Sequence, residues 1–275
     1  MTVCAVNLSS MITMNLTFRR FKTQCRVIHA LLLRETRTRF DRNKLGYLWA
    51  LFEPVTYVLA LYAVFAAIGR PSPIGSELDL ALFFLTGLIP WFLFAHTASK
   101  TMEGINSNKA LLTYPQVTAF DVLVARAILE LVTIIIVFVL LLLIFGYFGF
   151  THRIDNFLEL ASAFFTIWLL GLAMGFLNSS IKLYLPSFNQ TYSAIQRFLF
   201  FTSGIFFTAE MLPPNIREIA LYNPILHGIE WFRSAFFHSY ESYHLDKSFL
   251  FSIVLITLAL GLAAEHKSRK RARQL

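Results

Sequence analysis

The sequence predicts an all-α membrane protein with six transmembrane helices, an N-terminal amphipathic helix at the membrane surface and a re-entrant pair of short helices on the outer side before the last span. Three observations lead to this fold class. Hydrophobic residues make up 56% of the 275 residues and charged residues only 15%, whereas a soluble domain carries roughly 25% charged residues. The chain also contains six long apolar stretches, and its Lys and Arg residues gather at both termini.

Residues 17–44, which follow a tail over residues 1–16, predict an amphipathic helix. The apolar side chains that recur every three or four residues are Phe18, Phe21, Cys25, Ile28 and Leu32. The basic side chains that lie off this stripe are Arg19, Arg20, Lys22 and Arg26. Such a helix is too charged to span a membrane, but it suits the surface of an anionic inner leaflet. The alternative is a basic flank of the first span whose periodicity is accidental.

The membrane domain is predicted over residues 45–265. Its apolar stretches are 45–68, 80–99, 131–150, 158–177, 198–209 and 249–264. The third carries no charge, and extended back to Ala127 it can cross ~30 Å of hydrocarbon at about 1.5 Å per residue. The second contains Pro90, and the fifth is so short that it needs residues before Arg197 to span.

Basic residues predict the orientation of the chain. Residues 1–44 contain nine Lys and Arg, and residues 265–275 contain five. The segments 69–79 and 151–157 contain one each, Arg70 and Arg153. Because Lys and Arg concentrate in short cytoplasmic segments, both termini are expected in the cytoplasm, with an even number of spans between them. Residues 266–275 then form a basic cytoplasmic tail, and the net charge of +8 calls for no nucleic-acid partner.

Residues 210–246 are too apolar for an ordinary solvated loop. Pro213, Pro214 and Pro224 divide them into pieces over 215–222 and 225–237, each too short to cross a membrane. We therefore expect a re-entrant pair of helices over residues 213–238 on the outer side, where protein or a watery cavity would surround it. The alternative is an extracellular loop that carries two surface helices.

Motifs for catalysis and nucleotide binding are missing from the sequence. It has no G-x-x-x-x-G-K-[ST] phosphate loop, no H-E-x-x-H and no G-x-S-x-G, and no pair of carboxylates lies deep in one span. Cys4 and Cys25 fit no metal-ligand cluster. We therefore expect no catalytic residue, bound metal or cofactor. His96 is expected to be structural, with a polar wall residue as the alternative. Gly171 and Gly175 allow close helix approach, within the chain or between copies.

Charged residues lie in and beside the apolar spans. Asp121, Arg126 and Glu130 lie at the inner end of the third span. Arg126 and Glu130 are four residues apart and could pair on one helix face, although we favour simple anchoring at the interface. Glu230 and Arg233, three residues apart, could pair with each other or act in a gate.

A carboxylate also lies one or two turns inside the first span, at Glu53. Intramembrane carboxylates are costly and are usually paired or face a cavity. The expected partner of Glu53 is Arg34, Arg37 or Arg39, folded back at the interface. Pro54, the next residue, is expected to loosen the span at this point.

Three segments resemble the permease subunits of ABC-2-type exporters, above all the group that exports capsular and related polysaccharides. "RETRTRF" followed by "LGYLWALFEP" is similar to the start of that family's first span, with Leu45, Gly46, Trp49 and Pro54 at its motif positions. "NSNKALLTYPQVTAFDVLVAR" is similar to its cytoplasmic coupling helix, here at about 104–117. "LPPNIREIALYNPILHGIEWFR" is similar to its outer gate, whose pattern falls on Asn223, Pro224, His227, Glu230 and Arg233. The resemblance covers about residues 25–265.

The resemblance implies a permease without its own nucleotide site that works with a separate ABC ATPase, which binds ATP and Mg²⁺. In that family the amphipathic helix docks the ATPase, and the coupling helix inserts into a groove of the ATPase. The residues implied in ATPase coupling are Arg34, Glu35, Arg37, Arg39, Asn108, Lys109, Leu112, Tyr114 and Pro115. The residues implied in a hinge or lever are Gly46, Trp49, Glu53 and Pro54.

The resemblance further implies two permeases and two ATPases in the bacterial cytoplasmic (inner) membrane, in contact with lipids, with periplasmic and outer-membrane export proteins as further partners. The implied cargo is a polysaccharide, with a lipid-linked capsular polysaccharide as the first choice. Sugar rings stack on aromatic faces, and Tyr and Trp add a hydrogen-bonding tip. We therefore expect Tyr57, Tyr62 and Trp91 to line a channel formed by two copies. The alternatives are export of O-antigen, teichoic acid or a small drug or lipid, a membrane-embedded transferase, and a channel or scaffold without energy input.

Overall fold

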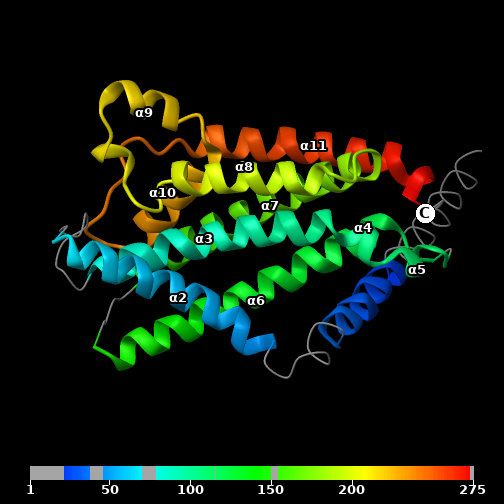
Figure 1. Cartoon of the computed structure of the whole chain (residues 1–275), viewed down its shortest axis with the longest axis horizontal. Coiled ribbons are helices and arrows are strands. Elements are labelled where there is room, and N and C mark those ends of the chain that lie inside the picture. Colours follow the sequence, from blue (N-terminus) through cyan, green and yellow to red (C-terminus); the bar gives the residue numbers. More distant parts are fainter. Residues whose placement is uncertain (1–21, 38–45, 70–78, 115, 150–153, 273–275) are drawn as a thin grey trace, which may run out of the picture.

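The computed structural model describes residues 22–37, 46–69, 79–114, 116–149 and 154–272, and every regular element within them is helical. Six helices run along the molecule and form a bundle (Figure 1). They are α2 (Gly46–Ala67), α3 (Asp79–Met102), α6 (Ala119–Tyr147), α7 (Phe157–Tyr184), α8 (Phe188–Thr202) and α11 (Lys247–Ala272). The all-α prediction is therefore confirmed for the described residues.

Four of the described helices, α3, α6, α7 and α11, are long and apolar enough to cross a membrane. The apolar run of α2 is described only over Phe52–Ala67 and is shorter. The 15 residues of α8 would extend about 22 Å at 1.5 Å per residue. Both helices nevertheless lie alongside the four longer ones (Figure 1). The membrane-protein class is thus supported, while the six-span topology stays a prediction.

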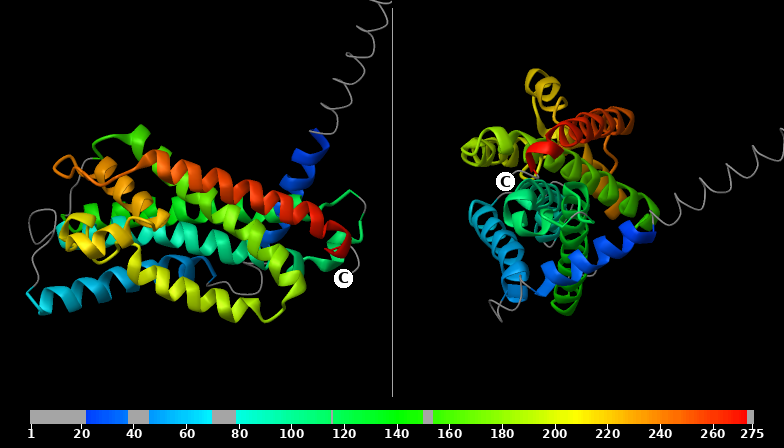
Figure 2. Two further views of the ribbon diagram at one scale, coloured as in Figure 1. Left: turned by 90° about the horizontal axis from the view of Figure 1, so that it is seen from above. Right: turned by 90° about the vertical axis from the view of Figure 1, so that its right-hand side faces the viewer.

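The two ends of the bundle differ. One end carries the N-terminal helix (residues 22–37), the one-turn helices α4 (Gly104–Ser107) and α5 (Lys109–Leu112), and the end of α11 (Figure 1). We call this the basic end, because Arg26, Arg34, Lys267 and Arg269 belong to it. The N-terminal helix crosses the basic end at a steep angle to the bundle (Figure 2). Both ends of the described chain thus share one end of the bundle, as an even number of spans requires.

The opposite end of the bundle carries the one-turn 3₁₀ helix η1 (Ala209–Met211) and the helices α9 (Pro214–Ala220) and α10 (Pro224–Phe236). α10 lies among α3, α7 and α11, and all of its 13 residues except Pro224 and Ser234 are buried. α9 buries none of its residues. The predicted pair therefore consists of one helix enclosed in the bundle and one on its surface, and whether the pair re-enters a membrane stays a prediction.

α7 is the centre of the bundle, since it makes its most extensive contacts with α3 and α11. Glycines allow these approaches: a Cβ atom on Gly171 would lie 2.9 Å from the Phe94 carbonyl oxygen of α3, and one on Gly175 would lie 2.5 Å from Thr101 Cβ. On the other side, a Cβ on Gly261 of α11 would lie 2.8 Å from the Ala173 carbonyl oxygen. Without a hydrophobic force between helices in lipid, small residues drive helix association by close van der Waals contact. The G-x-x-x-G motif therefore acts within the chain.

Polar contacts hold α7 at both of its ends. At the basic end, Lys182 forms an ion pair with Glu103, which joins α3 to α4. At the opposite end, Glu159 in the first turn of α7 accepts hydrogen bonds from Trp231 of α10 and from Lys247, the first residue of α11, the latter at 2.7 Å. Ion pairs and hydrogen bonds thus join α7 to the end of α3 at the basic end, and to α10 and α11 at the opposite end.

Burial inside the bundle differs among the long helices. Almost the whole of α3 is buried by other helices, whereas about a third of α6 is.

The helices α2 and α3 continue through Pro54 and Pro90 without a break. Pro54 itself is buried, and the predicted loosening of the first span at this residue stays a prediction.

The glycine contact between α7 and α3 can be tested with Gly175→Ala. The added methyl would overlap Thr101, so we expect the free energy of unfolding to fall by about 1–3 kcal/mol. The readout is the temperature at which the detergent-solubilised protein loses its monodisperse peak on size-exclusion chromatography. Gly146→Ala on α6 is the matched control, because nothing lies within 4 Å of its added methyl. Equal melting of the two variants would contradict the packing account.

Candidate functional site

Asn108 lies at the break between α4 and α5 and joins them to the N-terminal helix. Its side chain is buried; the amide oxygen accepts a hydrogen bond from Arg34 Nη1 at 2.9 Å, and the amide nitrogen donates to Glu35 Oε1 at 2.7 Å. The same nitrogen donates to the Gly104 carbonyl oxygen at 3.1 Å. The predicted single coupling helix over 104–117 is thus two one-turn helices separated by a polar contact point.

Glu35 and Arg126 extend this contact to α6 and α3. Arg126 Nε lies 3.1 Å from Glu35 Oε1, and its Nη1 donates to the Lys100 carbonyl oxygen at 3.2 Å. Arg126 of α6 thus forms an ion pair with Glu35 of the N-terminal helix, a partner far away along the chain. Both side chains of this ion pair are about 15% exposed, so solvent screens the pair less than it would a surface salt bridge. We call Arg34, Glu35, Asn108 and Arg126 the junction.

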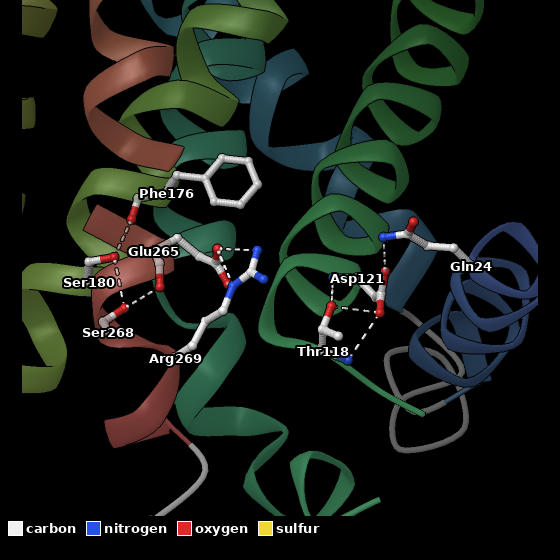
Figure 3. Close-up of polar contacts among 8 residues, drawn as sticks. All are labelled: Gln24, Thr118, Asp121, Phe176, Ser180, Glu265, Ser268 and Arg269. Carbon is white, nitrogen blue, oxygen red and sulfur yellow. Dashed lines mark hydrogen bonds and ion pairs between the residues drawn. The ribbon is translucent and has the colours of Figure 1, made fainter. Parts of the chain in front are cut away.

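A second contact places the N-terminal helix on the start of α6 (Figure 3). Gln24 Nε2 donates to Asp121 Oδ1 at 2.9 Å. Asp121 also accepts from the backbone and side chain of Thr118, which in turn caps the helix. Asp121 is therefore both a helix cap and an attachment point for the N-terminal helix, while anchoring of this cluster at the membrane interface stays a prediction.

The end of α11 is held to α7 at the same level (Figure 3). Ser268 Oγ lies 3.4 Å from Ser180 Oγ, and the buried carboxylate of Glu265 receives Arg269 at 3.0 Å. Residues up to Ala272 continue the helix. The predicted basic tail is thus, where the structure describes it, a direct extension of α11.

The other described residues implied in coupling lie on the N-terminal helix and in or next to α5. Lys109 and Tyr114 are exposed, Arg37 is exposed on the N-terminal helix, and Leu112 is buried. Arg39 and Pro115 lie outside the described residues. A cavity of about 370 Å³ adjoins the junction and is lined by Glu35, Lys100, Glu103, Ser107, Arg126, Leu129 and Glu130. The structure therefore gathers part of the predicted set at one place, while its role in coupling stays a prediction.

A groove of about 540 Å³ lies between α2, α3 and α8. Its half toward the basic end is polar, and its half toward the opposite end is aromatic. The polar half is lined by Glu53, His96, Ser99, Ser193 and Gln196, and the aromatic half by Tyr57, Trp91, Phe92, Phe200 and Phe201, with Ala95 and Arg197 completing the lining. The aromatic rings are in contact: the Phe200 centroid lies 5.5 Å from that of Trp91 and 6.2 Å from that of Tyr57.

Glu53 pairs with His96 across this groove, with Oε1 3.8 Å from Nε2. The expectation that Arg34, Arg37 or Arg39 is its partner is therefore wrong for the described arginines, because Arg34 is engaged by Asn108 at the basic end. His96, expected to be structural, lies on the groove wall.

Of the three aromatic candidates, Tyr57 and Trp91 line the groove and Tyr62 does not. Gly46 and Trp49 lie in the first turn of α2, and the side chain of Trp49 is outside the described part.

Arg233 of α10 holds the chain that follows α8. Its fully buried guanidinium donates to the carbonyl oxygens of Gly204 at 2.6 Å and Ile205 at 3.1 Å, and to those of Phe83 and Phe207 at 3.3 Å. Its Cζ also lies 3.8 Å from the ring centroid of Phe83. A buried cation is tolerated only where such groups replace its hydration.

The predicted pairing of Glu230 with Arg233 is not what the structure shows. Glu230 accepts instead from the Ala209 backbone nitrogen at 3.1 Å and from the Tyr240 hydroxyl. Burial is the main cause that raises the pKa of the Tyr240 hydroxyl, so it stays protonated and donates at neutral pH. Glu230 therefore joins α10 to η1 and to the chain before α11.

The two other gate candidates begin and orient α10. Asn223 caps the helix by accepting from the Ile225 backbone nitrogen at 3.0 Å, and Pro224 is its first residue. His227 is buried; its Nε2 donates to the Leu221 carbonyl oxygen at 2.8 Å, and its Nδ1 accepts from the Asp246 backbone nitrogen at 3.1 Å. These contacts require a neutral imidazole. All five candidates thus fix the position of α10, and a gating role stays a prediction.

Several residues at these sites escaped the sequence reasoning. Gln24 and Phe200 gave no signal, because a single amide and one of 29 Phe residues are unremarkable in this chain. Tyr240 and Ser268 gave none either. Arg197 was visible in the sequence only as the charge directly before the fifth apolar stretch. A cation at such a place in a membrane protein is a signal that could have marked it as a candidate functional residue.

Comparisons with known proteins agree with this architecture. The family described as "ABC-2 type transporter" matches residues 26–237. The chain is similar to the polysialic acid transport protein KpsM of Escherichia coli, with 32% identity over 253 residues that cover 92% of this chain and 96% of KpsM. It is 29% identical to the capsule polysaccharide export inner-membrane protein CtrC of Neisseria meningitidis serogroup B, over 90% of this chain and 92% of CtrC. It is 26% identical to the capsule polysaccharide export inner-membrane protein BexB of Haemophilus influenzae, over 87% of this chain and 89% of BexB.

The contribution of Arg233 can be measured with Arg233→Met. Removing the guanidinium takes a donor from four carbonyl oxygens, of which that of Phe83 still accepts from Thr86 Oγ1. Each buried group left unsatisfied costs about 1–3 kcal/mol. We expect the apparent melting temperature in detergent to fall by several degrees or the folded protein to be lost. Arg26→Met, which removes an exposed cation from the N-terminal helix, is the control. Unchanged melting of Arg233→Met would mean that these contacts do not hold the chain after α8.

Proposed function

The chain belongs to the ABC-2 type transporter family, and from this premise we propose that it is the permease subunit of an ATP-driven polysaccharide exporter. The cargo is a lipid-linked capsular polysaccharide, and it crosses the bacterial cytoplasmic membrane through a channel formed by two copies of the chain. The relatives' names support this cargo, because the alignments run through nearly the whole of both chains. A separate ATPase subunit binds ATP and Mg²⁺ and supplies the energy.

The observation that carries the proposal is the groove between α2, α3 and α8. Hydrogen-bonding side chains line one half and amphipathic aromatic rings line the other. A sugar has a polar rim of hydroxyl groups and an apolar ring face, so such a surface can contact both. The groove is open on one side, and a second copy of the chain would close it into a channel long enough for a polymer.

The junction supplies the route by which a partner ATPase acts on the groove. The exposed residues Arg37, Lys109 and Tyr114 offer the partner a surface beside it. The junction also reaches α3 through the Lys100 carbonyl oxygen, one turn from His96 on the groove wall. In this proposal, ATP-driven closure of the partner moves the N-terminal helix, and the movement reaches α3 and α6 through Glu35, Asn108 and Arg126.

Co-purification from the native membrane tests the assembly and the cargo. We expect an ABC ATPase in about equal amount with this chain, together with a lipid-linked glycan, both identified by mass spectrometry. A glycan of the O-antigen or teichoic-acid type would keep the exporter and change the cargo. If no ATPase is captured, even after crosslinking through a cysteine introduced at the exposed Ala110 of α5, the exporter proposal fails and a membrane enzyme or scaffold takes its place.

The junction is tested with Glu35→Ala. The variant removes the contact of the N-terminal helix with Arg126 and one of its two contacts with Asn108, leaving that of Arg34. We therefore expect export to fall about tenfold while the permease and ATPase stay assembled, in the range of measured coupling energies. Surface polysaccharide per cell, normalised to the amount of co-purified ATPase, is the readout. Glu218→Ala, which removes an exposed carboxylate from α9 at the opposite end, is the control. Wild-type export by Glu35→Ala would exclude the junction as the coupling element.

A further inference from the structure

Four deeply buried polar side chains lie where α3, α7 and α8 come together, and we call them the polar seam. They are Thr97 and Thr101 of α3, Asn178 of α7 and Tyr192 of α8, each at most 2% exposed. Among the described residues, none is a hydrogen-bond partner of the three hydroxyl groups or of the Asn178 amide nitrogen. A buried polar group without a partner costs free energy, so four of them at one place call for an explanation.

Close packing of the helices brings these side chains together. Thr101 lies against Gly175 of α7, where an added Cβ would be 2.5 Å from Thr101 Cβ, and Asn178 follows Gly175 by almost one helical turn. Tyr192 packs in one cluster with Met102, the residue after Thr101. The Tyr192 hydroxyl faces Asn178 but forms no direct hydrogen bond with it. Polar groups from three helices therefore face one another without pairing.

The threonines of the polar seam differ from other buried threonines of the bundle. Thr86, Thr133 and Thr166 each donate to the carbonyl oxygen four residues earlier in their own helix, at distances between 2.7 and 2.9 Å. Thr97, which lies one turn before Thr101, also packs against α7. Neither of these two hydroxyls bonds to its own helix, so both remain available to a molecule between the helices.

The chemistry of the polar seam indicates which molecule could join its groups. The four side chains are uncharged, so they offer an ion no opposite charge, and Lys182 lies one turn along α7 from Asn178. Hydroxyl groups both donate and accept hydrogen bonds, and an amide nitrogen donates. A small neutral molecule that does both can satisfy groups from all three helices at once. Water fits this requirement, because a buried water typically makes roughly two to four hydrogen bonds.

We propose that the polar seam binds ordered water, which bridges Tyr192 of α8 to Thr101 of α3 and Asn178 of α7. Tyr192 is the only buried residue of α8, all of whose residues are described. One turn further along α8, Gln196 donates directly to the Ala95 carbonyl oxygen of α3. The water therefore supplies the inner attachment of a helix that forms one wall of the groove. This inference goes beyond the proposed function, because it concerns how that wall is held and not what passes along it.

Radiolytic footprinting tests whether water is bound at the polar seam. An X-ray pulse converts water into hydroxyl radicals, and these oxidise the side chains that the water touches, inside a protein as well as on its surface. The sample is the assembly that co-purifies with this chain. We expect oxidation of Tyr192, although this side chain is 1% exposed. Phe232 is the internal control, because it is 0% exposed and lies among aromatic rings, and we expect it to stay unmodified.

Variants identify the groups that hold the water. The double variant Thr101→Val/Asn178→Leu keeps the volume of both side chains and removes their polar atoms, so we expect oxidation of Tyr192 to be lost. Thr86→Val is the matched control on the same helix. Its hydroxyl is equally buried but bonds to its own helix, so we expect this variant to keep the oxidation of Tyr192.

The sign of a stability change gives a second readout. Tyr192→Phe removes only the hydroxyl group. Loss of a hydroxyl that bonds to water lowers the apparent melting temperature in detergent, whereas loss of a buried hydroxyl without a partner raises it. We expect the melting temperature of Tyr192→Phe to fall by a few degrees.

Three results would overturn the inference. If Tyr192 is not oxidised and Tyr192→Phe melts at a lower temperature, the side chains of the polar seam bond directly to one another. If Tyr192 is not oxidised and Tyr192→Phe melts at a higher temperature, these groups have no partner. Oxidation of Tyr192 that persists in the double variant would mean that water of the groove reaches this side chain by another route. The proposed export function would stand in each case, because none of these readouts depends on it.

Discussion

The close contact of α7 with α3 on one side and α11 on the other is the constraint on which the rest of the structure depends. Gly171, Gly175 and Gly261 allow it, because any larger side chain there would meet backbone or Thr101. Lipid offers no hydrophobic gain for bringing helices together, so this fit has to supply the association. Once α7 is in place, Lys182 and Glu159 extend its hold to both ends of the bundle.

α3 is shared by the junction and the groove. Its Lys100 carbonyl oxygen accepts from Arg126 of the junction, and His96, one turn away, lies on the groove wall opposite Arg197. Because the rest of α3 is enclosed by other helices, it cannot bend locally without disturbing its contacts with α7. In the proposed coupling, a displacement of the N-terminal helix would therefore move α3 as a whole helix and change the groove along its length.

Much of the fold could be predicted from the sequence, because apolar runs and helical periodicity are local. Partners could not, since they lie far apart along the chain. Glu53 was recognisable as a carboxylate within an apolar stretch, yet its partner His96 is on another helix. Glu35 and Arg126 are separated by 91 residues. Arg233 illustrates a different difficulty: its spacing from Glu230 suggested an ion pair, but backbone carbonyls after α8 satisfy it. At the groove, Tyr57 and Trp91 were identified by residue type, whereas Arg197 required the helix face.

The contrast between the enclosed α3 and the lipid-facing α6 has a consequence for biogenesis. α6 has the more apolar sequence, so it can partition into the bilayer as soon as it is synthesised. α3 carries buried Thr86, Thr97 and Thr101, and these side chains find their protein surroundings only when later helices arrive. One wall of α7 is supplied by α11, the last of the described helices. The central stack is therefore completed only once α11 has been synthesised, long after α3.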